Sequence, residues 1–208
     1  MGRKISHQDW IMLNVDDLGV RRDRLIDQIQ TVFKDVKLGD GITLCEAGAI
    51  EGYGTDKERA LAREMDQDIH WSQVDIEYAD PGSIALSFVD ATGFRFYLPA
   101  CLVYTLKHDF TDFFGGAPSE LRSSNCIPSI LNRSSTESSA ISDGDGSPFG
   151  NFTRRECMCI ARFLVFYAVL QTNEYFDGAF EALKNHWGQY LSIQEMRNLQ
   201  KIWRNRLS

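Results

Sequence analysis

Three segments of this chain carry the same helix-start signal, a hydroxyl residue three positions before a glutamate. The pairs are Thr55 with Glu58, Thr153 with Glu156, and Ser192 with Glu195. In this capping box the hydroxyl accepts a backbone hydrogen bond from the third helical residue, and the glutamate bonds back to the capping residue. Each pair precedes a helix-compatible segment: residues 60–68, 157–170 and 196–207. The pattern therefore predicts a mainly α-helical fold.

Apolar residues at three- and four-residue steps predict further helices. They cover residues 22–36, 44–50, 84–89, 98–106 and 173–190, the last capped by Asn173. We expect Asp80-Pro81 to open the helix over 84–89, Gly93 to break it, and Leu98-Pro99 to open the next one. Residues 10–15 and 74–78 are compatible with short strands. The expected fold is a single compact helical domain of seven or eight helices with at most minor β-structure.

The segment from residue 115 to 151 differs in amino-acid composition from the rest of the chain. It holds ten serines and three of the five prolines, with few apolar anchors. Such a composition buries too little surface to offset the entropy of ordering. We therefore expect a flexible insertion at 115–151 between an N-terminal helical part, 1–114, and C-terminal helices, 152–208, that pack on it.

Composition and charge exclude several classes of protein. No apolar run approaches the roughly 18 residues of a membrane span, and the first residues lack the apolar core of a secretory signal. The net charge of −7 argues against a nucleic-acid binder, which needs a basic face. The five cysteines are odd in number and scattered, unlike a secreted disulfide framework. We expect a cytoplasmic protein with free thiols.

Motifs that would signal catalysis are absent from the sequence. It contains no G-x-S-x-G, no phosphate-binding G-x-x-x-x-G-K, no G-x-G-x-x-G and no H-E-x-x-H. The four histidines lie far apart, and Cys157 and Cys159 would point away from each other on a helix. We therefore expect no catalytic residue, no metal and no cofactor, although an enzyme remains an open alternative.

Acidic residues are concentrated in one part of the chain. Between Asp40 and Asp80 there are eleven acids and three bases, whereas the remaining residues are nearly neutral. Complementary charge speeds association and fixes register, and aromatic residues are common interface anchors. The predicted partner-binding residues are the acids and aromatics of this stretch: Glu64, Asp66, Asp68, Trp71, Asp75, Glu77 and Tyr78. In the alternative interpretation this is an ordinary solvated face, and the two aromatics belong to the core.

The segment Phe94–Ala100 reads F-R-F-Y-L-P-A and follows Gly93. With the residues before it, it resembles the hallmark of a family of small bacterial proteins of unknown function. The resemblance covers residues 22–109 and resumes at 153–168. It implies no activity, so no catalytic residue is carried over. Physically, the aromatics indicate packing at a helix start, or alternatively a ligand pocket beneath the Phe94–Tyr97 turn.

Three hypotheses for function follow. The first is a small acidic protein-binding module, most concretely a bacterial immunity protein that neutralises a basic toxin or effector. The second is a ligand-binding protein or enzyme that uses a pocket at the Phe94–Tyr97 turn. The third is an effector delivered into host cells, because Gly2 with Ser6 fits a myristoylation pattern.

Overall fold

The computed structural model describes residues 15–66, 70–76, 86, 88–115, 126–132, 149–170 and 178–206. These residues form α-helices and two short 3-10 helices and contain no strand, so the mainly α fold is confirmed. The elements are α2 (Val15–Val32), α3 (Leu44–Glu51), α4 (Asp56–Met65), η1 (Trp71–Gln73), α5 (Ala91–Gly115), α6 (Cys126–Leu131), α7 (Arg154–Leu170), α8 (Gly178–Asn185), η3 (Trp187–Tyr190) and α9 (Ile193–Arg206).

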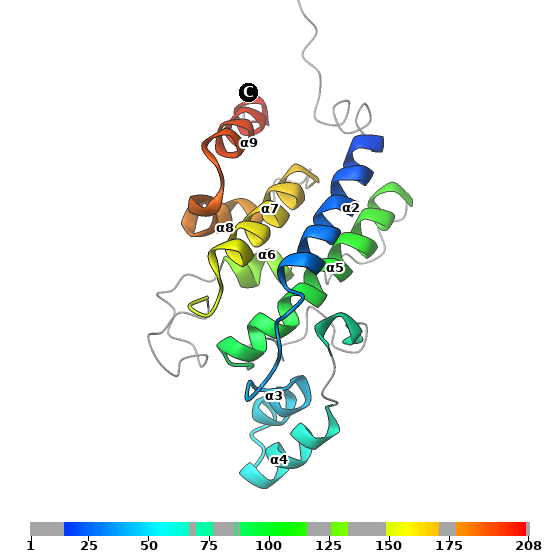
Figure 1. Ribbon diagram of the computed structural model, residues 1–208, viewed down its shortest axis with the longest axis vertical. Helices are drawn as coiled ribbons and strands as arrows, with labels where there is room; N and C mark the ends of the chain where they lie inside the picture. The colour runs from blue at the N-terminus through cyan, green and yellow to red at the C-terminus, as the bar shows by residue number, and fades with distance from the viewer. Residues whose placement is uncertain are drawn as a thin grey trace, which may run out of the picture.

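The body of the protein is built on α2, which lies beside both α5 and α7 (Figure 1). Helices α6 and α8 and the turn η3 pack together on the other side of α7. Helix α7 is central, as its nearly uniform apolar surface predicts, because Ile160, Phe163 and Leu164 are fully buried. Helices α3 and α4 pack on each other at one end of the molecule, and α9 lies near the opposite end (Figure 1).

All three predicted capping boxes are present, with hydrogen bonds in both directions. The backbone N–H of Thr55, Thr153 and Ser192 donates to the glutamate of its own box at 2.7, 2.7 and 2.8 Å. In return the backbone N–H of each glutamate donates to the hydroxyl, at 3.4, 3.3 and 3.2 Å. These boxes are made within four consecutive residues, so the sequence alone is enough to locate them.

The expected break at Gly93 and new helix at Pro99 are wrong. Helix α5 runs through both residues, because Asp90 begins it: the Asp90 carboxylate accepts hydrogen bonds from the N–H of Gly93 at 2.7 Å and of Ile42 at 3.0 Å. A Cβ at Gly93 would lie 2.4 Å from the carbonyl oxygen of Ile42. Gly93 therefore allows a loop to approach the helix closely, and does not end one.

Several predicted elements differ in extent from those observed. Val15 belongs to α2 and Val74 follows η1, so neither lies in a strand, and residues 10–14, 77 and 78 are outside the described part. Phe88 and Val89 precede α5 and are not helical, while residues 80–85 are not described. Asn173 also falls outside. The helix expected over 173–190 is observed as α8 followed by η3, with the chain turning at His186.

Two pieces of the serine-rich segment belong to the hydrophobic core. Ile127 and Leu131 of α6 are fully buried, and the carbonyl of Leu131 accepts a hydrogen bond from the indole N–H of Trp187 at 2.9 Å. Phe149 packs edge-on against the same indole, with ring centroids 4.9 Å apart. The expectation that this segment has few anchors is corrected at these two places. Residues 116–125 and 133–148 are not described.

Candidate functional site

Helix α4 contributes no buried residue, although it carries large apolar side chains. Leu61 is 54% exposed and Met65 is 74% exposed. Residues four apart lie on one face of a helix, so these two side chains form a continuous apolar strip. Just before α4, Tyr53 is 97% exposed in a turn where its φ of 57° holds it in the left-handed region. Exposed apolar groups close together are typical of interaction surfaces.

Acidic residues accompany this apolar strip. Asp56, Glu58 and Glu64 are all exposed on α4. The hydrogen bonds from the backbone and side chain of Thr55 lower the pKa of Glu58, so its carboxylate is charged at neutral pH. We call Leu61, Met65, Glu58 and Glu64 together the α4 surface.

The two arginines of α4 bind α3, and Arg59 also pairs with Asp56 at 3.9 Å, so Asp56 belongs to their side of the helix. Arg63 donates to Glu46 at 2.9 Å and to the carbonyl oxygens of Gly41 and Gly39 at 2.8 and 3.1 Å. Arg59 contacts the other oxygen of Glu46 at 3.4 Å. Two of the three bases between residues 40 and 80 are therefore neutralised on the inner side of α4. The outer side keeps its acids, with Lys57 as the remaining base.

The predicted helix over 44–50 is observed as α3, and Glu46 belongs to a capping pair at its start that was not predicted. Thr43 and Glu46 have the same spacing as the other boxes, and the N–H of Glu46 donates to the Thr43 hydroxyl at 3.1 Å. The Glu46 carboxylate binds Arg59 and Arg63 instead of closing the box. The S/T-x-x-E signal was available in the sequence, but the use of this glutamate depends on tertiary contacts.

The predicted partner-binding residues have different positions. Glu64 and Asp75 are exposed, whereas Asp66 is half-buried and accepts a hydrogen bond from the N–H of Cys45 at 2.9 Å. Trp71 is 1% exposed, and its indole N–H donates to the carbonyl of Phe33 at 2.8 Å, so it belongs to the core. Asp68, Glu77 and Tyr78 lie outside the described residues.

A shallow cleft beside η1 brings Trp71 and Asp75 together. It has a volume of about 270 Å³ and lies between η1 and α5, which supplies Val103 and Lys107. The cleft has one acidic and one basic side chain in its wall, Asp75 and Lys107, so its charge is balanced. The α4 surface is the more strongly acidic of the two places.

The aromatic motif of α5 is tightly packed. Phe94, Phe96 and Tyr97 are all buried, as the packing interpretation predicts. The Tyr97 hydroxyl accepts a hydrogen bond from the N–H of Leu44 at 3.3 Å, and burial raises the pKa of this phenol. The Phe96 ring packs edge-on against Tyr97 with centroids 5.0 Å apart. These aromatics do not line the cleft beside η1, nor the second cleft, which lies between α2, α7 and α9.

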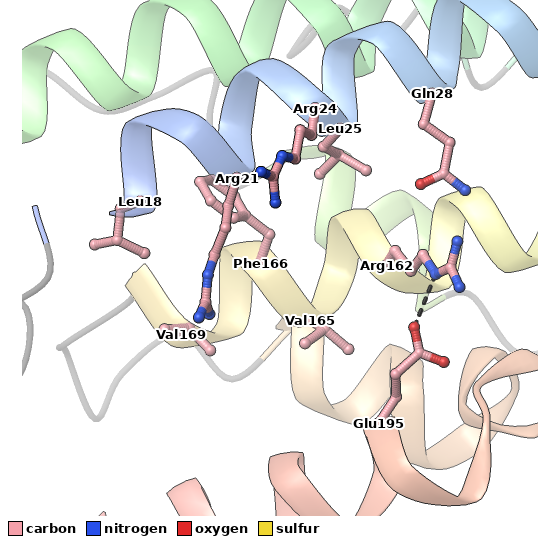
Figure 2. Close-up of a pocket in the computed structure, with 10 residues that line it drawn as sticks. All are labelled: Leu18, Arg21, Arg24, Leu25, Gln28, Arg162, Val165, Phe166, Val169 and Glu195. Atoms are coloured by element: carbon pink, nitrogen blue, oxygen red, sulfur yellow. Dashed lines mark hydrogen bonds and ion pairs between the residues drawn. The ribbon is translucent and has the colours of Figure 1, made fainter. Parts of the chain in front are cut away.

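A second cleft, of about 310 Å³, lies where α2, α7 and α9 meet (Figure 2). Its rim carries three arginines, Arg21 and Arg24 from α2 and Arg162 from α7. Among the described residues of its wall, Glu195 of α9 is the one acid, and its carboxylate accepts a hydrogen bond from the Nε of Arg162 at 2.8 Å. We call this the arginine cleft. Because it joins helices far apart in the sequence, no local pattern could have indicated it.

Among the residues that the structure describes, the thiols and ligating side chains offer little chemistry. In the described part of the chain, no group of three His, Cys, Asp or Glu side chains could hold a metal ion. Burial raises the pKa of Cys101 and Cys159 to about 12, and thiols with such pKa values are poor nucleophiles. No helix in the described ranges is both long and apolar enough to cross a membrane.

Comparison with known proteins identifies a family but no activity. The sequence profile described as "Family of unknown function (DUF6714)" matches residues 21–191. The family resemblance carried by the Phe94–Ala100 motif is thereby confirmed, and the match extends over the serine-rich segment and as far as the end of η3. No curated protein and no solved structure matches the chain.

Proposed function

We propose that this chain, which belongs to that family of unknown function, is a protein-binding module that recognises a basic partner through its α4 surface. The observation that carries the proposal is the exposure of Leu61 and Met65 on a helix that buries none of its residues. A helix with no buried residue adds little to the core, so its apolar strip is better explained by a partner than by folding.

The chemistry of the α4 surface favours a basic protein over other partners. Leu61 and Met65 supply an apolar centre that can be fully desolvated on binding, and Met adapts its shape to the facing surface. Glu58 and Glu64 lie on the same short helix and supply a polar, negatively charged rim. Charges of this sign steer a positively charged protein toward the site and repel nucleic acids and anionic lipids.

The same surface is rigid, which reduces the cost of binding. Thr55 and Glu58 form a closed capping box at the start of α4, and the ion pairs of Arg59 and Arg63 with Glu46 hold the helix against α3. A surface already held in its bound shape loses less conformational entropy when a partner arrives.

An immunity protein that neutralises a cognate bacterial toxin is the most concrete form of this function. A small helical domain with an acidic, rigid docking helix suits inhibition by tight binding to a basic toxin surface. In that case the toxin gene is expected beside the gene for this chain, and the two proteins are expected to form a complex.

The experiment is co-expression of the neighbouring gene's product with wild-type protein and with two matched variants. The Leu61→Asn/Met65→Gln variant should lose protection against growth arrest, because it removes the apolar centre. The control is Ile193→Asn, which changes another hydrophobic residue, 73% exposed, on α9. It should protect as well as wild type. Equal protection by both variants would contradict docking at α4, and a neighbouring product that neither arrests growth nor binds would contradict the immunity role.

A further inference from the structure

We propose that the arginine cleft between α2, α7 and α9 binds a small organic carboxylate, with its anionic end at the arginines and its apolar body against the helices. This inference is independent of the α4 surface, which lies at the other end of the molecule (Figure 1). It rests on the charge of the rim, the apolar floor and the size of the cleft.

The rim of the cleft has an excess of positive charge. Three guanidinium groups face one carboxylate, that of Glu195. Arg21 and Arg24 extend from α2 into the space above α7, and Arg162 rises from α7 below Gln28 (Figure 2). Glu195 binds Arg162, whereas Arg24 has no counter-charge among the described residues. A bound carboxylate would supply one.

Donors for such an anion are available in the structure. Arg24 makes no hydrogen bond or ion pair with any described residue. Arg162 uses its Nε for Glu195, and its terminal nitrogens make no bond within the described part of the chain. A guanidinium presents five N–H groups in a fixed plane, so Arg24 alone can bind both oxygens of a carboxylate.

The floor of the cleft selects for an apolar body. It is formed by Leu25, Val165, Phe166 and Val169, together with Leu18. Of these side chains only Val165 is more than slightly exposed, so packing in the core holds the others in place. The volume of about 310 Å³ is at the lower end of the range for small-molecule sites. Inorganic phosphate would leave the floor uncovered, and a protein helix would not fit. An aliphatic or aromatic carboxylate matches both parts.

The test uses octanoate as the probe, with octanamide and inorganic phosphate as controls, on the full chain with labelled methyl groups. Octanoate should shift the methyl resonances of Leu25, Val165 and Val169 in a saturable manner. Octanamide should bind at least tenfold more weakly, because it lacks the charge, and phosphate should leave these methyl groups unchanged. Added salt should weaken octanoate binding, because the arginines are on the surface.

Two variants locate the site. Arg24→Gln should weaken octanoate binding by about tenfold to a hundredfold, as expected for the loss of a charge-assisted hydrogen bond. Arg155→Gln is the matched control, because Arg155 is exposed on α7 and does not line the cleft. Val165→Phe should fill the cleft and block binding while leaving the arginines in place.

Several results would overturn the proposal. Binding of octanamide as tight as that of octanoate would show that the arginines play no part. Equal effects of Arg24→Gln and Arg155→Gln would show a nonspecific attraction to positive charge. Saturable shifts confined to methyl groups outside the cleft would place the ligand elsewhere. Absence of any shift at octanoate concentrations below its micelle range would exclude this class of ligand.

Discussion

Glu156 of α7 binds Arg95 of α5 through both carboxylate oxygens, at 2.8 and 3.1 Å, while it also closes the capping box with Thr153. Its side chain is almost completely buried, whereas that of Arg95 keeps access to water. One carboxylate thus starts a central helix and fixes it to its neighbour. Glu195 repeats the arrangement with Ser192 and Arg162. Partial burial raises the pKa of the Glu195 carboxyl. The hydrogen bonds from Ser192 and Arg162 lower this pKa by more, so it lies below its ordinary value.

The first prediction concerns the cost of breaking this ion pair. Glu156→Gln should keep the cap, since glutamine also serves in a capping box, and should leave Arg95 without its counter-charge. We expect a loss of about 1–3 kcal/mol in the free energy of unfolding, less than for a fully buried pair because Arg95 reaches water. Urea unfolding measures it. Glu58→Gln is the control, because its box is exposed and has no arginine partner. Similar losses in both variants would mean that the ion pair adds nothing.

The capping boxes show which parts of the fold could be predicted from the sequence. Thr55, Thr153 and Ser192 start helices through bonds within four residues, so their signals were sufficient. The start of α5 was not predicted, because Asp90 was not preceded by a clear pattern and its second bond is to Ile42, far away in the chain. The sequence around Pro99 therefore predicts a first-turn proline, although Pro99 lies inside α5.

The candidate sites likewise have features that the sequence predicts and others that depend on tertiary packing. The acidity of α4 was visible in the sequence, but the exposure of Leu61 and Met65 was not, since the same i, i+4 spacing usually indicates a buried face. The acidic neighbours of Trp71 favour an interface, whereas its bond to Phe33 places it in the core, as the alternative interpretation predicts. The arginine cleft depends on the packing of α2 against α7, which no local signal contains.

The second prediction concerns the serine-rich segment. Ile127 is fully buried in α6, so Ile127→Ala should cost about 2–5 kcal/mol in the free energy of unfolding. Ile193→Ala, at an exposed position of α9, should change it by less than about 0.5 kcal/mol. Chemical denaturation monitored by tryptophan fluorescence is suitable, because α6 contacts Trp187 through Leu131. If Ile127→Ala were as stable as wild type, α6 would not be a part of the cooperative core.

The third prediction concerns His186, whose ring packs against both Phe149 and Trp187, with centroids 5.3 and 4.9 Å away. Its Nε2 is buried without a hydrogen-bond partner among the described residues, and burial lowers the pKa of the imidazole. The unfolded chain therefore binds a proton more readily than the folded one. The free energy of unfolding should keep its full value above a pH of about 6.5, the ordinary pKa of histidine. It should fall as the pH drops toward the lowered pKa of the folded state.

His186→Gln should flatten this dependence between pH 7 and pH 5, and the measurement is the urea midpoint at each pH. The control is His70→Gln, since His70 is exposed. An imidazole pKa at or above 6.5 in the folded protein, measured by NMR titration, would contradict the prediction.

The last prediction concerns the negative charge of residues 40–80 and rests on the proposed function. Among the described residues, Glu64 and Asp75 are the predicted partner-binding acids that are exposed, so Glu64→Lys/Asp75→Lys should leave the free energy of unfolding within roughly 1 kcal/mol of wild type, about 0.5 for each surface change. Once the basic partner is identified, the double variant should associate with it more slowly than wild type does. Its association rate should also depend less on salt, because charge steering acts mainly on that rate. The matched control is Asp27→Lys, an exposed acid of α2 outside residues 40–80, which should associate as wild type does. Stopped-flow measurements at low and high ionic strength separate the two variants. If the control slowed association as much as the double reversal, overall net charge would account for the effect, and the acidic segment would be an ordinary solvated face.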